Sequence, residues 1–387
     1  MGKKLVDPNK LCMGCMALLD NIQKPCPKCG FLITEYRQPA DSMPLYEILN
    51  GKYLVGKVIG IGGFGITYIG WDFYQSKRVC IKEYFPKGVA ARDPNASVST
   101  QYSTCSMDVF TKNTQQAKYA YMGGLQSYIK EAGILSKFYL MPGIVSVRDF
   151  FYGNKTAYIV MEYIEGINLR QFAKACGGRI AADYLFQLLK DVIKALNAVH
   201  KAGVVHRDIS PDNIMINQQY QAKVIDFGAA KNYNNMQEKS ILLKHGYAPI
   251  EQYDRNGNQG PWTDVYSLCA TMYYLLSGVK LQKSYERIAQ DFVVPLQSRG
   301  VSISMQQDKV ILKGLSIQIE DRYQTMAELY YDLYQECLPG ETPPQEQGKR
   351  NEGQRIEELD PTVPELSREE AARAYLEQHL KQENEKR

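Results

Sequence analysis

The sequence lacks the long apolar runs and the strong charge bias that mark several classes of protein. No stretch of 18 consecutive apolar residues occurs, and Lys3 and Lys4 near the N-terminus precede no apolar segment. Neither a membrane-spanning helix nor a secretory leader is therefore expected. The net charge of +4 over 387 residues is small, and it predicts no strong binding to nucleic acid. The length allows two or three domains.

A disulfide framework is also not expected, because the nine cysteines divide into one cluster and a scattered remainder. Four of them lie close together near the N-terminus. This distribution predicts a reducing, cytoplasmic compartment and a local metal site. The scattered cysteines are Cys80, Cys105, Cys176, Cys269 and Cys337.

The clustered cysteines form two C-x-x-C pairs, Cys12 with Cys15 and Cys26 with Cys29. Two such pairs facing each other provide four thiolates in a tetrahedron, which suits Zn²⁺. Redox chemistry is the rival, but no thioredoxin-like βαβ context accompanies the pairs. Residues 1–33 therefore resemble a small zinc ribbon. Its role beyond structure stays open among a structural cap, docking of a partner protein, nucleic-acid binding and redox or metal sensing. Few basic residues occur beyond Lys10, Lys24 and Lys28, which favours the first two.

The most informative feature is a pair of short motifs in the middle of the chain. The segment 206–213 reads His-Arg-Asp-Ile-Ser-Pro-Asp-Asn, and Asp226-Phe227-Gly228 follows it at short range. Asp208 can accept a proton from a substrate hydroxyl, while Asn213 and Asp226 can hold Mg²⁺ against the phosphates of ATP. The combination indicates phosphoryl transfer and not a surface loop followed by a turn.

A glycine-rich stretch and a lysine precede these motifs. Gly60-Ile61-Gly62-Gly63-Phe64-Gly65 lies between two apolar runs, where its backbone can approach phosphate oxygens without a Cβ in the way. A Rossmann turn has similar glycines but requires a helix next, whereas the β-branched and aromatic residues 66–69 predict a strand. Lys82 comes at the distance of the following strand and can reach the phosphates.

Together these motifs resemble the protein kinase family, most closely the bacterial-type (eukaryotic-like) Ser/Thr kinases. The resemblance implies an α+β, bilobal kinase fold over residues 51–338, with a β-rich N-lobe over about 51–162 and a helical C-lobe over about 163–338. ATP with Mg²⁺ (or Mn²⁺) would occupy the cleft. Lys82 and Glu131 would form the ion pair that holds the nucleotide, after an insertion over 92–126. The residues expected at the nucleotide are Gly60, Gly62, Gly63, Phe64, Gly65, Thr67, Cys80, Lys82, Met161, Glu162, Tyr163 and Met215.

The resemblance also covers the region after the catalytic motifs. Glu251 would close the activation segment 226–251 and pair with Arg322, and Asp264 would brace the catalytic loop. Arg207 either pairs with a phosphate on the activation segment or only braces the loop. The candidate phosphorylation sites are Ser240, then Tyr233 and Tyr247.

The sequence departs from the family pattern at two linked positions. Ser210 stands where these kinases usually carry a lysine that steadies the γ-phosphate, and Lys244 stands where they carry a threonine. We expect Lys244 to reach back to Ser210 and to replace the missing cation, because a lysine can arrive from either segment. The alternative is an exposed loop lysine.

The remaining segments are a linker over 34–50 and a largely disordered tail over 339–387, with a final helix expected over 367–386. Apolar periodicity predicts helices over 181–200 and 265–276.

The sequence therefore predicts a kinase that transfers the γ-phosphate of ATP to Ser or Thr hydroxyls of protein substrates, with autophosphorylation as one outcome. Its catalytic residues would be Asp208, Lys82, Glu131, Asn213, Asp226 and Lys244. A nucleotide-binding pseudokinase scaffold and a zinc-ribbon adaptor remain as alternatives. The presence of every group that the chemistry requires argues against the first.

Overall fold

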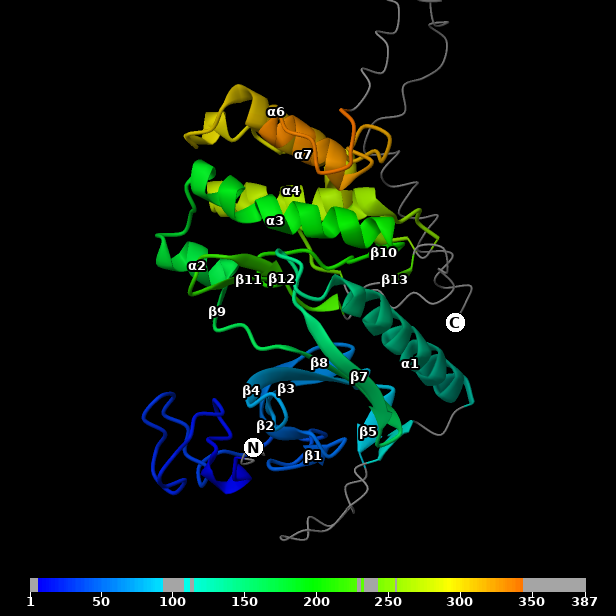
Figure 1. Ribbon diagram of the computed structural model, residues 1–387. Coiled ribbons are helices and arrows are strands. Elements are labelled where there is room, and N and C mark those ends of the chain that lie inside the picture. Colours follow the sequence, from blue (N-terminus) through cyan, green and yellow to red (C-terminus); the bar gives the residue numbers. More distant parts are fainter. Residues whose placement is uncertain are drawn as a thin grey trace, which may run out of the picture. The chain divides into compact units, whose positions relative to one another are not determined.

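The computed structural model describes residues 6–92, 108–111, 115–227, 231–232, 243–254 and 256–343. The chain divides into two compact units, Met1–Glu165 and Gly166–Arg387 (Figure 1). The first is rich in strands and the second in helices, which confirms the predicted α+β class. The predicted helix over 367–386 and the candidate sites Ser240 and Tyr233 lie outside the described residues.

A six-stranded antiparallel sheet forms the framework of the first unit, in the order β1-β2-β3-β4-β8-β7. The β-branched and aromatic runs that predicted strands are indeed strands, and most of the residues of β2 and β3 are buried or half-buried. The strands are β1 (Ile48–Leu49), β2 (Tyr53–Ile61), β3 (Gly65–Asp72), β4 (Lys77–Tyr84), β7 (Val147–Gly153) and β8 (Thr156–Glu162).

The long helix of the first unit begins earlier than the sequence pattern predicted. Helix α1 spans Gln115–Leu135, followed by the 3₁₀ turn η2 at Ser136–Phe138, so residues 115–126 are helix and not loop. A buried stripe at three- and four-residue spacing explains this start; its members are Tyr121, Leu125, Tyr128, Ala132 and Leu135. Before α1, β5 (Ala90–Arg92) pairs with β6 (Val109–Thr111).

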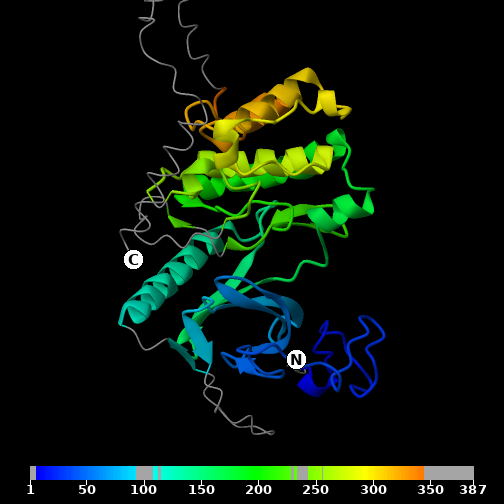
Figure 2. The ribbon, with the colours of Figure 1, turned by 180° about the vertical axis from the view of Figure 1, so that it is seen from behind.

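The N-terminal cysteine segment, which includes the 3₁₀ turn η1 (Pro8–Lys10), packs against this sheet. Leu11, Met13 and Met16 form a buried cluster with Leu54 of β2 and Ile69 of β3. Figures 1 and 2 both show the segment, in dark blue, beside these strands. The cysteine segment therefore shares an apolar core with the sheet.

The stretch 34–50, predicted as a linker, is also packed. Arg92 donates from its backbone N–H to a carboxylate oxygen of Asp41 (3.1 Å) and from Nε to the Asp41 carbonyl (2.8 Å). Its guanidinium also pairs with the buried Glu83. The hydroxyl of Tyr68 donates to Glu83 (2.9 Å) and accepts from the backbone N–H of Met43 (3.0 Å). A buried polar network thus fixes this stretch to the sheet. Its charged members, Arg92 and Glu83, are paired with each other, which offsets the cost of burying them.

The second unit is built around two long helices. Helix α3 (Ala182–Lys201) buries one face, as its periodicity predicted, and α4 (Pro261–Ser277) is buried on nearly every side. Helices α6 (Met305–Gly314) and α7 (Met326–Tyr334) pack on this pair. A small sheet lies on its other side, in the order β12 (Ala222–Val224), β11 (Ile214–Asn217), β9 (Gly166–Asn168) (Figure 1).

The other elements of the second unit are short. They are α2 (Leu169–Ala175), β10 (Val204–Val205), β13 (Lys231–Asn232), η4 (Ile250–Gln252), α5 (Ser284–Ala289) and η5 (Gln297–Arg299). Across the described part of the chain, no helix combines the length and apolar content that a membrane crossing needs.

Candidate active site and metal centre

A buried carboxylate holds the loop that carries Asp208. Asp264, on α4, is fully buried and accepts hydrogen bonds from the backbone N–H groups of His206 (2.7 Å) and Arg207 (2.8 Å). It also contacts His200 Nε2 at 2.7 Å. Arg207 has a φ of 69°, a left-handed conformation that costs free energy for a non-glycine residue. The two hydrogen bonds to Asp264 offset this cost and fix the direction in which the loop leaves β10.

His206 connects this loop to the segment that carries Asp226. Its Nδ1 accepts from the backbone N–H of Asp208 (3.2 Å), and its Nε2 lies 3.0 Å from the carbonyl of Ile225. Burial lowers the pKa of His206 below its usual value, so the ring is neutral, with Nδ1 free to accept and Nε2 protonated. The ring of Phe227 meets the imidazole of His206 edge-on, with 4.4 Å between the two ring centroids. The imidazole thus sets the spacing between the two motifs.

The side chains of Asp208 and Asn213 are in direct contact. Asn213 Nδ2 donates to both the carbonyl and Oδ2 of Asp208, each at 2.8 Å. The backbone N–H of Ile225 donates to the carbonyl of Asn213 (2.9 Å). This hydrogen bond joins the residue before β11 to the residue before Asp226. Asp226 has a φ of 63° and lies close enough to influence the ionisation of Asp208. The three predicted polar groups of this unit therefore converge.

Lys244 reaches the same cluster. Its Nζ lies 2.9 Å from Ser210 Oγ and 3.3 Å from Asp208 Oδ1, so the predicted contact with Ser210 is present. Burial raises the pKa of Asp208 above its ordinary value, while the charge of Lys244 opposes that rise. A carboxyl with a raised pKa is a stronger base once ionised, which suits proton acceptance from a hydroxyl.

The predicted salt bridge at the end of the activation segment is present. Arg322 makes two hydrogen bonds to the carboxylate of Glu251, at 2.8 and 3.1 Å, and both side chains are almost fully buried. Thr263 of α4 donates to the same carboxylate (2.9 Å). Tyr247, a candidate phosphorylation site, is only 3% exposed, and its buried ring does not offer a kinase an accessible hydroxyl.

In the first unit, Lys82 on β4 is 7% exposed. Helix α1 is fixed to this strand by the hydroxyl of Tyr128, which donates to the Lys82 carbonyl (3.1 Å). Glu131 lies one turn further along α1, and residues three apart share a helix face. The structure thus places the predicted partner on the face of α1 that meets β4. The sequence pattern had not identified Tyr128, because a tyrosine on a helix gives no signal of what it contacts.

The predicted nucleotide-binding residues of this unit lie on adjacent strands. Thr67 pairs with Lys82, and Cys80 pairs with Met161. In the glycine-rich turn, a Cβ at Gly65 would lie 2.2 Å from the Glu83 carbonyl oxygen, so only glycine allows this approach of β3 to β4. The carbonyls of Gly63 and Phe64 accept from the backbone at 85–87, which braces the turn.

The residues predicted for the hinge adjoin the cysteine segment. Glu162 ends β8 and accepts from the backbone N–H of Ser146 (2.8 Å). Tyr163 packs against the apolar cluster that contains Met13 and Met16. Met215, the predicted floor of the adenine site, lies on β11 in the second unit and pairs with Asn168.

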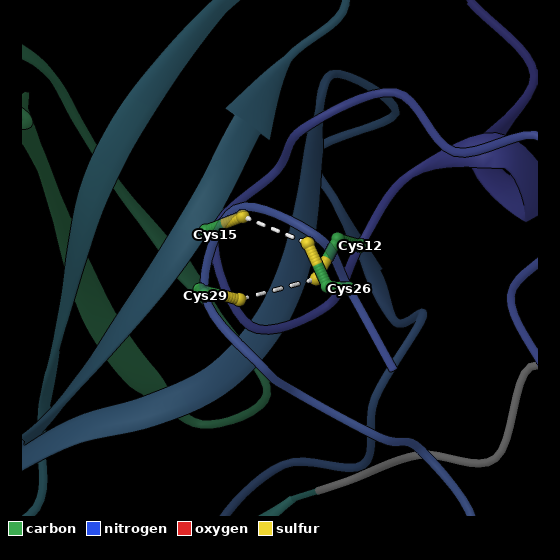
Figure 3. A group of neighbouring side chains, drawn as sticks. All are labelled: Cys12, Cys15, Cys26 and Cys29. Carbon is green, nitrogen blue, oxygen red and sulfur yellow. Dashed lines mark hydrogen bonds between the residues drawn. The ribbon is translucent and has the colours of Figure 1, made fainter. Parts of the chain in front are cut away.

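The four clustered cysteines form a compact set. All four sulfur atoms lie within 4.8 Å of one another, and the pairs Cys12–Cys29 and Cys15–Cys26 are each 3.7 Å apart (Figure 3). A disulfide needs about 2.05 Å. Four sulfurs each about 2.3 Å from one tetrahedral ion lie about 3.8 Å apart. The arrangement therefore fits a single tetrahedral metal ion.

The turns around this centre explain why glycine occurs in it. Gly14 donates its N–H to Cys12 Sγ (3.3 Å), and a Cβ there would lie 2.4 Å from Phe31 Cβ. Gly30 has a φ of 69°, the left-handed region that favours glycine.

Comparison with known proteins agrees with this geometry. The family described as "Protein kinase domain" matches residues 96–338, more than half of the chain. The serine/threonine-protein kinase PknB of Mycobacterium leprae is 29% identical over 300 residues, which cover 74% of this chain and 43% of that protein. The serine/threonine-protein kinase F of Synechocystis is 28% identical over 294 residues, which cover 74% and 55%.

A solved structure described as "PpkA-294 apo form" has a TM-score of 0.63 and 31% sequence identity, and it covers 76% of this chain and 100% of that one. The chain belongs to the protein kinase domain family, and the predicted kinase fold is confirmed. Membership implies ATP and Mg²⁺ as its nucleotide and metal. The chain spans roughly half the length of the curated relatives it matches.

Proposed function

We propose that the chain is a protein kinase that transfers the γ-phosphate of ATP to Ser or Thr hydroxyls of proteins. The observation that carries this proposal is the cluster at Asp208: a carboxylate with a raised pKa, in contact with Asn213 and Lys244, on a loop braced by buried Asp264. A scaffold that only binds nucleotide has no need of a base held so firmly.

Asp208 orients the acceptor hydroxyl and takes its proton. Lys244, through its contacts with Ser210 and Asp208, supplies the cation that steadies the transferred phosphoryl group. In the bound complex, Asn213 and Asp226 hold Mg²⁺, which neutralises charge on the phosphates. Because phosphoryl transfer has a loose transition state, most of the rate comes from positioning and charge neutralisation.

In the first unit, Lys82, fixed by Glu131, holds the α- and β-phosphates, and the glycine-rich turn covers them. Thr67, Cys80, Met161 and the hinge residues after it line the adenine site, with Met215 as its floor. These roles follow the family pattern; the positions of Tyr128 and Gly65 support them, since one fixes α1 to β4 and the other sets the turn.

We also propose that Cys12, Cys15, Cys26 and Cys29 hold one Zn²⁺. The sulfur spacing supports a tetrahedral ion. The ion would stabilise the segment by joining its two turns, which have too little apolar surface to fold alone. The apolar side of this ribbon is already covered by the sheet, which favours a structural role over partner docking. The cytoplasmic location predicted from the cysteine distribution stays a prediction.

Mass spectrometry of the chain after incubation with Mg²⁺-ATP and a generic protein substrate tests this function. We expect phosphate on Ser or Thr residues of the substrate, and on the chain itself if autophosphorylation occurs. The matched control is Asp208→Asn, which keeps the shape but removes the base. It should retain ATP binding, measured by calorimetry, and lose nearly all transfer. Equal labelling by both proteins would refute the role of Asp208, and absence of labelling with intact ATP binding would favour a pseudokinase.

A further inference from the structure

An arginine neutralises the second acidic residue of the catalytic loop. Arg170, on α2, donates from Nε and Nη2 to the two carboxylate oxygens of Asp212, at 2.7 and 2.9 Å. A two-point pair of this kind is strong and directional. Asp212 is therefore committed to a partner within the chain.

Two tyrosine rings keep the arginine in place. Arg170 Nη2 also donates to the hydroxyl of Tyr247 (3.2 Å), and its guanidinium lies 5.0 Å from the ring centroid of Tyr274 and 5.9 Å from that of Tyr247. Cation–π contacts at this range add to the stability of the pair. A basic side chain from another protein would have to displace this arrangement to reach Asp212.

Two lysines add positive charge to the same surface. Lys280 is exposed, its Nζ lies 5.9 Å from the Tyr247 ring, and its stem rests on Gly246, where a Cβ would be 2.8 Å from Lys280 Cε. Within the described part of the chain, it forms no ion pair with an acidic side chain. The Tyr247 ring joins Lys280 to Arg170, because its hydroxyl accepts from Arg170 Nη2 and its face lies beside Lys280 Nζ. Lys244 Nζ lies 3.3 Å from Asp208 Oδ1 on the same loop.

Two of the three cations on this surface are paired within the chain, Arg170 with Asp212 and Lys244 with Asp208. Among the described residues, Lys280 has no acidic partner. The side chains of Arg170 and Lys244 are about one-third exposed, so the surface is accessible to a substrate segment. Lys280 is therefore the cation on this surface that is left to meet a negative charge on the segment that approaches Asp208.

We propose that this surface selects acceptor segments that carry an anionic side chain, a carboxylate or a phosphate, within a few residues of the hydroxyl. The inference rests on the proposed kinase function, because it concerns the segment delivered to Asp208. Such a side chain meets Lys280 and the outer side of Arg170. A basic side chain at the same place meets like charges and finds Asp212 already paired. Arg170 is a positioning residue in this scheme, and Lys280 determines specificity.

Peptide kinetics with the full chain test the inference. Three peptides share one Ser acceptor and differ only at the flanking positions, which carry Glu, Gln or Lys; a fourth carries phosphoserine. Gln matches Glu in shape without its charge. We expect kcat/KM for the Glu peptide to exceed that for the Gln peptide by about two- to fivefold per glutamate, and the Lys peptide to be the poorest. The Glu:Gln ratio should fall toward one as salt rises, because exposed charges are screened.

Lys280→Glu should lower the Glu:Gln ratio to below one. The matched control is Lys313→Glu, because Lys313 on α6 also lies over a tyrosine ring, 4.1 Å from the centroid of Tyr323, and its change should leave the ratio as it is. Circular dichroism confirms folding; if Lys280→Glu does not fold, Lys280→Gln and the salt series give the same information. A preference for phosphoserine over glutamate would support the inference and identify phosphate as the anion.

The experiment separates a failure of the anionic preference from a failure of the kinase function. Phosphorylation of the Gln peptide that depends on Asp208, with a Glu:Gln ratio of one or a preference for Lys, would overturn the inference and leave the kinase function intact. Absence of Asp208-dependent transfer to every peptide and to every protein substrate would overturn both.

Discussion

Replacing Lys244 with methionine removes the ammonium group that contacts Asp208 and keeps the approximate length of the side chain. Lys244 Nζ lies 3.3 Å from Asp208 Oδ1 and 2.9 Å from Ser210 Oγ. If this ammonium takes the place of the usual catalytic-loop lysine, the change should lower kcat far more than it raises KM for ATP. If it is only a loop lysine, kcat should be unaffected.

The distance gives the scale of the effect. At 3.3 Å, two unit charges interact by about 1 kcal/mol in a water-like dielectric and about 5 kcal/mol at an effective dielectric constant of about 20. The Lys244 side chain is 35% exposed, so solvent screening places the effect toward the lower value. A loss of about 1.4 to 2.8 kcal/mol corresponds to a fall in kcat of about 10- to 100-fold.

The pH profile gives a second measurement of the same charge. Lys244 lowers the pKa of Asp208, against the rise caused by burial, so its removal should raise that pKa further. Asp208 acts as a base only when ionised, and activity is therefore lost as pH falls through its pKa. In Lys244→Met, the acidic limb of the kcat profile should move to higher pH. An exposed lysine elsewhere, Lys313→Met, is the control and should move neither quantity.

A double variant tests whether the cation can act from position 210 as well as from position 244. Ser210→Lys combined with Lys244→Thr returns the cation to the position that related kinases use. We expect this double variant to recover most of the activity that Lys244→Met loses, since the site needs the charge and not its point of attachment. An unchanged kcat and an unshifted acidic limb in Lys244→Met would refute the role of this lysine outright.

Three further predictions concern stability. A chelator that removes the metal should lower the melting temperature of the chain, and elemental analysis of the untreated protein should give about one zinc per chain; identical melting with and without chelator would contradict the metal centre. Gly56→Ala should destabilise the fold by about 1 to 3 kcal/mol, because the new Cβ would lie 2.3 Å from Met16 Cε, whereas Gly133→Ala, with ordinary contacts, should not. Arg322→Met should cost about 3 to 5 kcal/mol in urea unfolding, since it leaves the buried Glu251 unpaired; an unchanged unfolding midpoint would argue against that pair as a source of stability.

The sequence predicted the parts of the molecule that the chemistry fixes. Phosphoryl transfer needs particular groups in a particular order, so Asp208, Asn213 and Asp226 could be identified without coordinates, and they converge in the structure. The contact between Lys244 and Ser210 could be predicted because the amine and the hydroxyl each stand where related kinases carry the other group. The tetrahedral spacing of the cysteines follows from the geometry of the metal. The catalytic and metal-binding roles themselves stay predictions.

Other features could not be predicted, because they depend on how distant segments meet. The start of α1 was missed, since the tyrosines of its buried stripe have moderate helix propensity and resemble a loop in sequence. The pairing of Arg170 with Asp212 joins residues far apart in the sequence, and a lone arginine carries no signal of its partner. The packing of Met13 and Met16 on the sheet depends on surface shape, which periodicity does not encode.

The hydrogen bonds along β2 carry a consequence for how this protein can change over evolution. The strand shifts register between Val55 and Gly60, and there the backbone N–H of Lys57 donates to the Met13 carbonyl (2.8 Å), while that of Val58 donates to Tyr36 and Gln38. A shortened chain that begins at residue 51 would lose all of these acceptors and expose Leu54 and Ile69 to water. The cysteine-bearing module is therefore not freely exchangeable between kinases, and substitutions on its apolar side should be inherited together with substitutions on the facing strand.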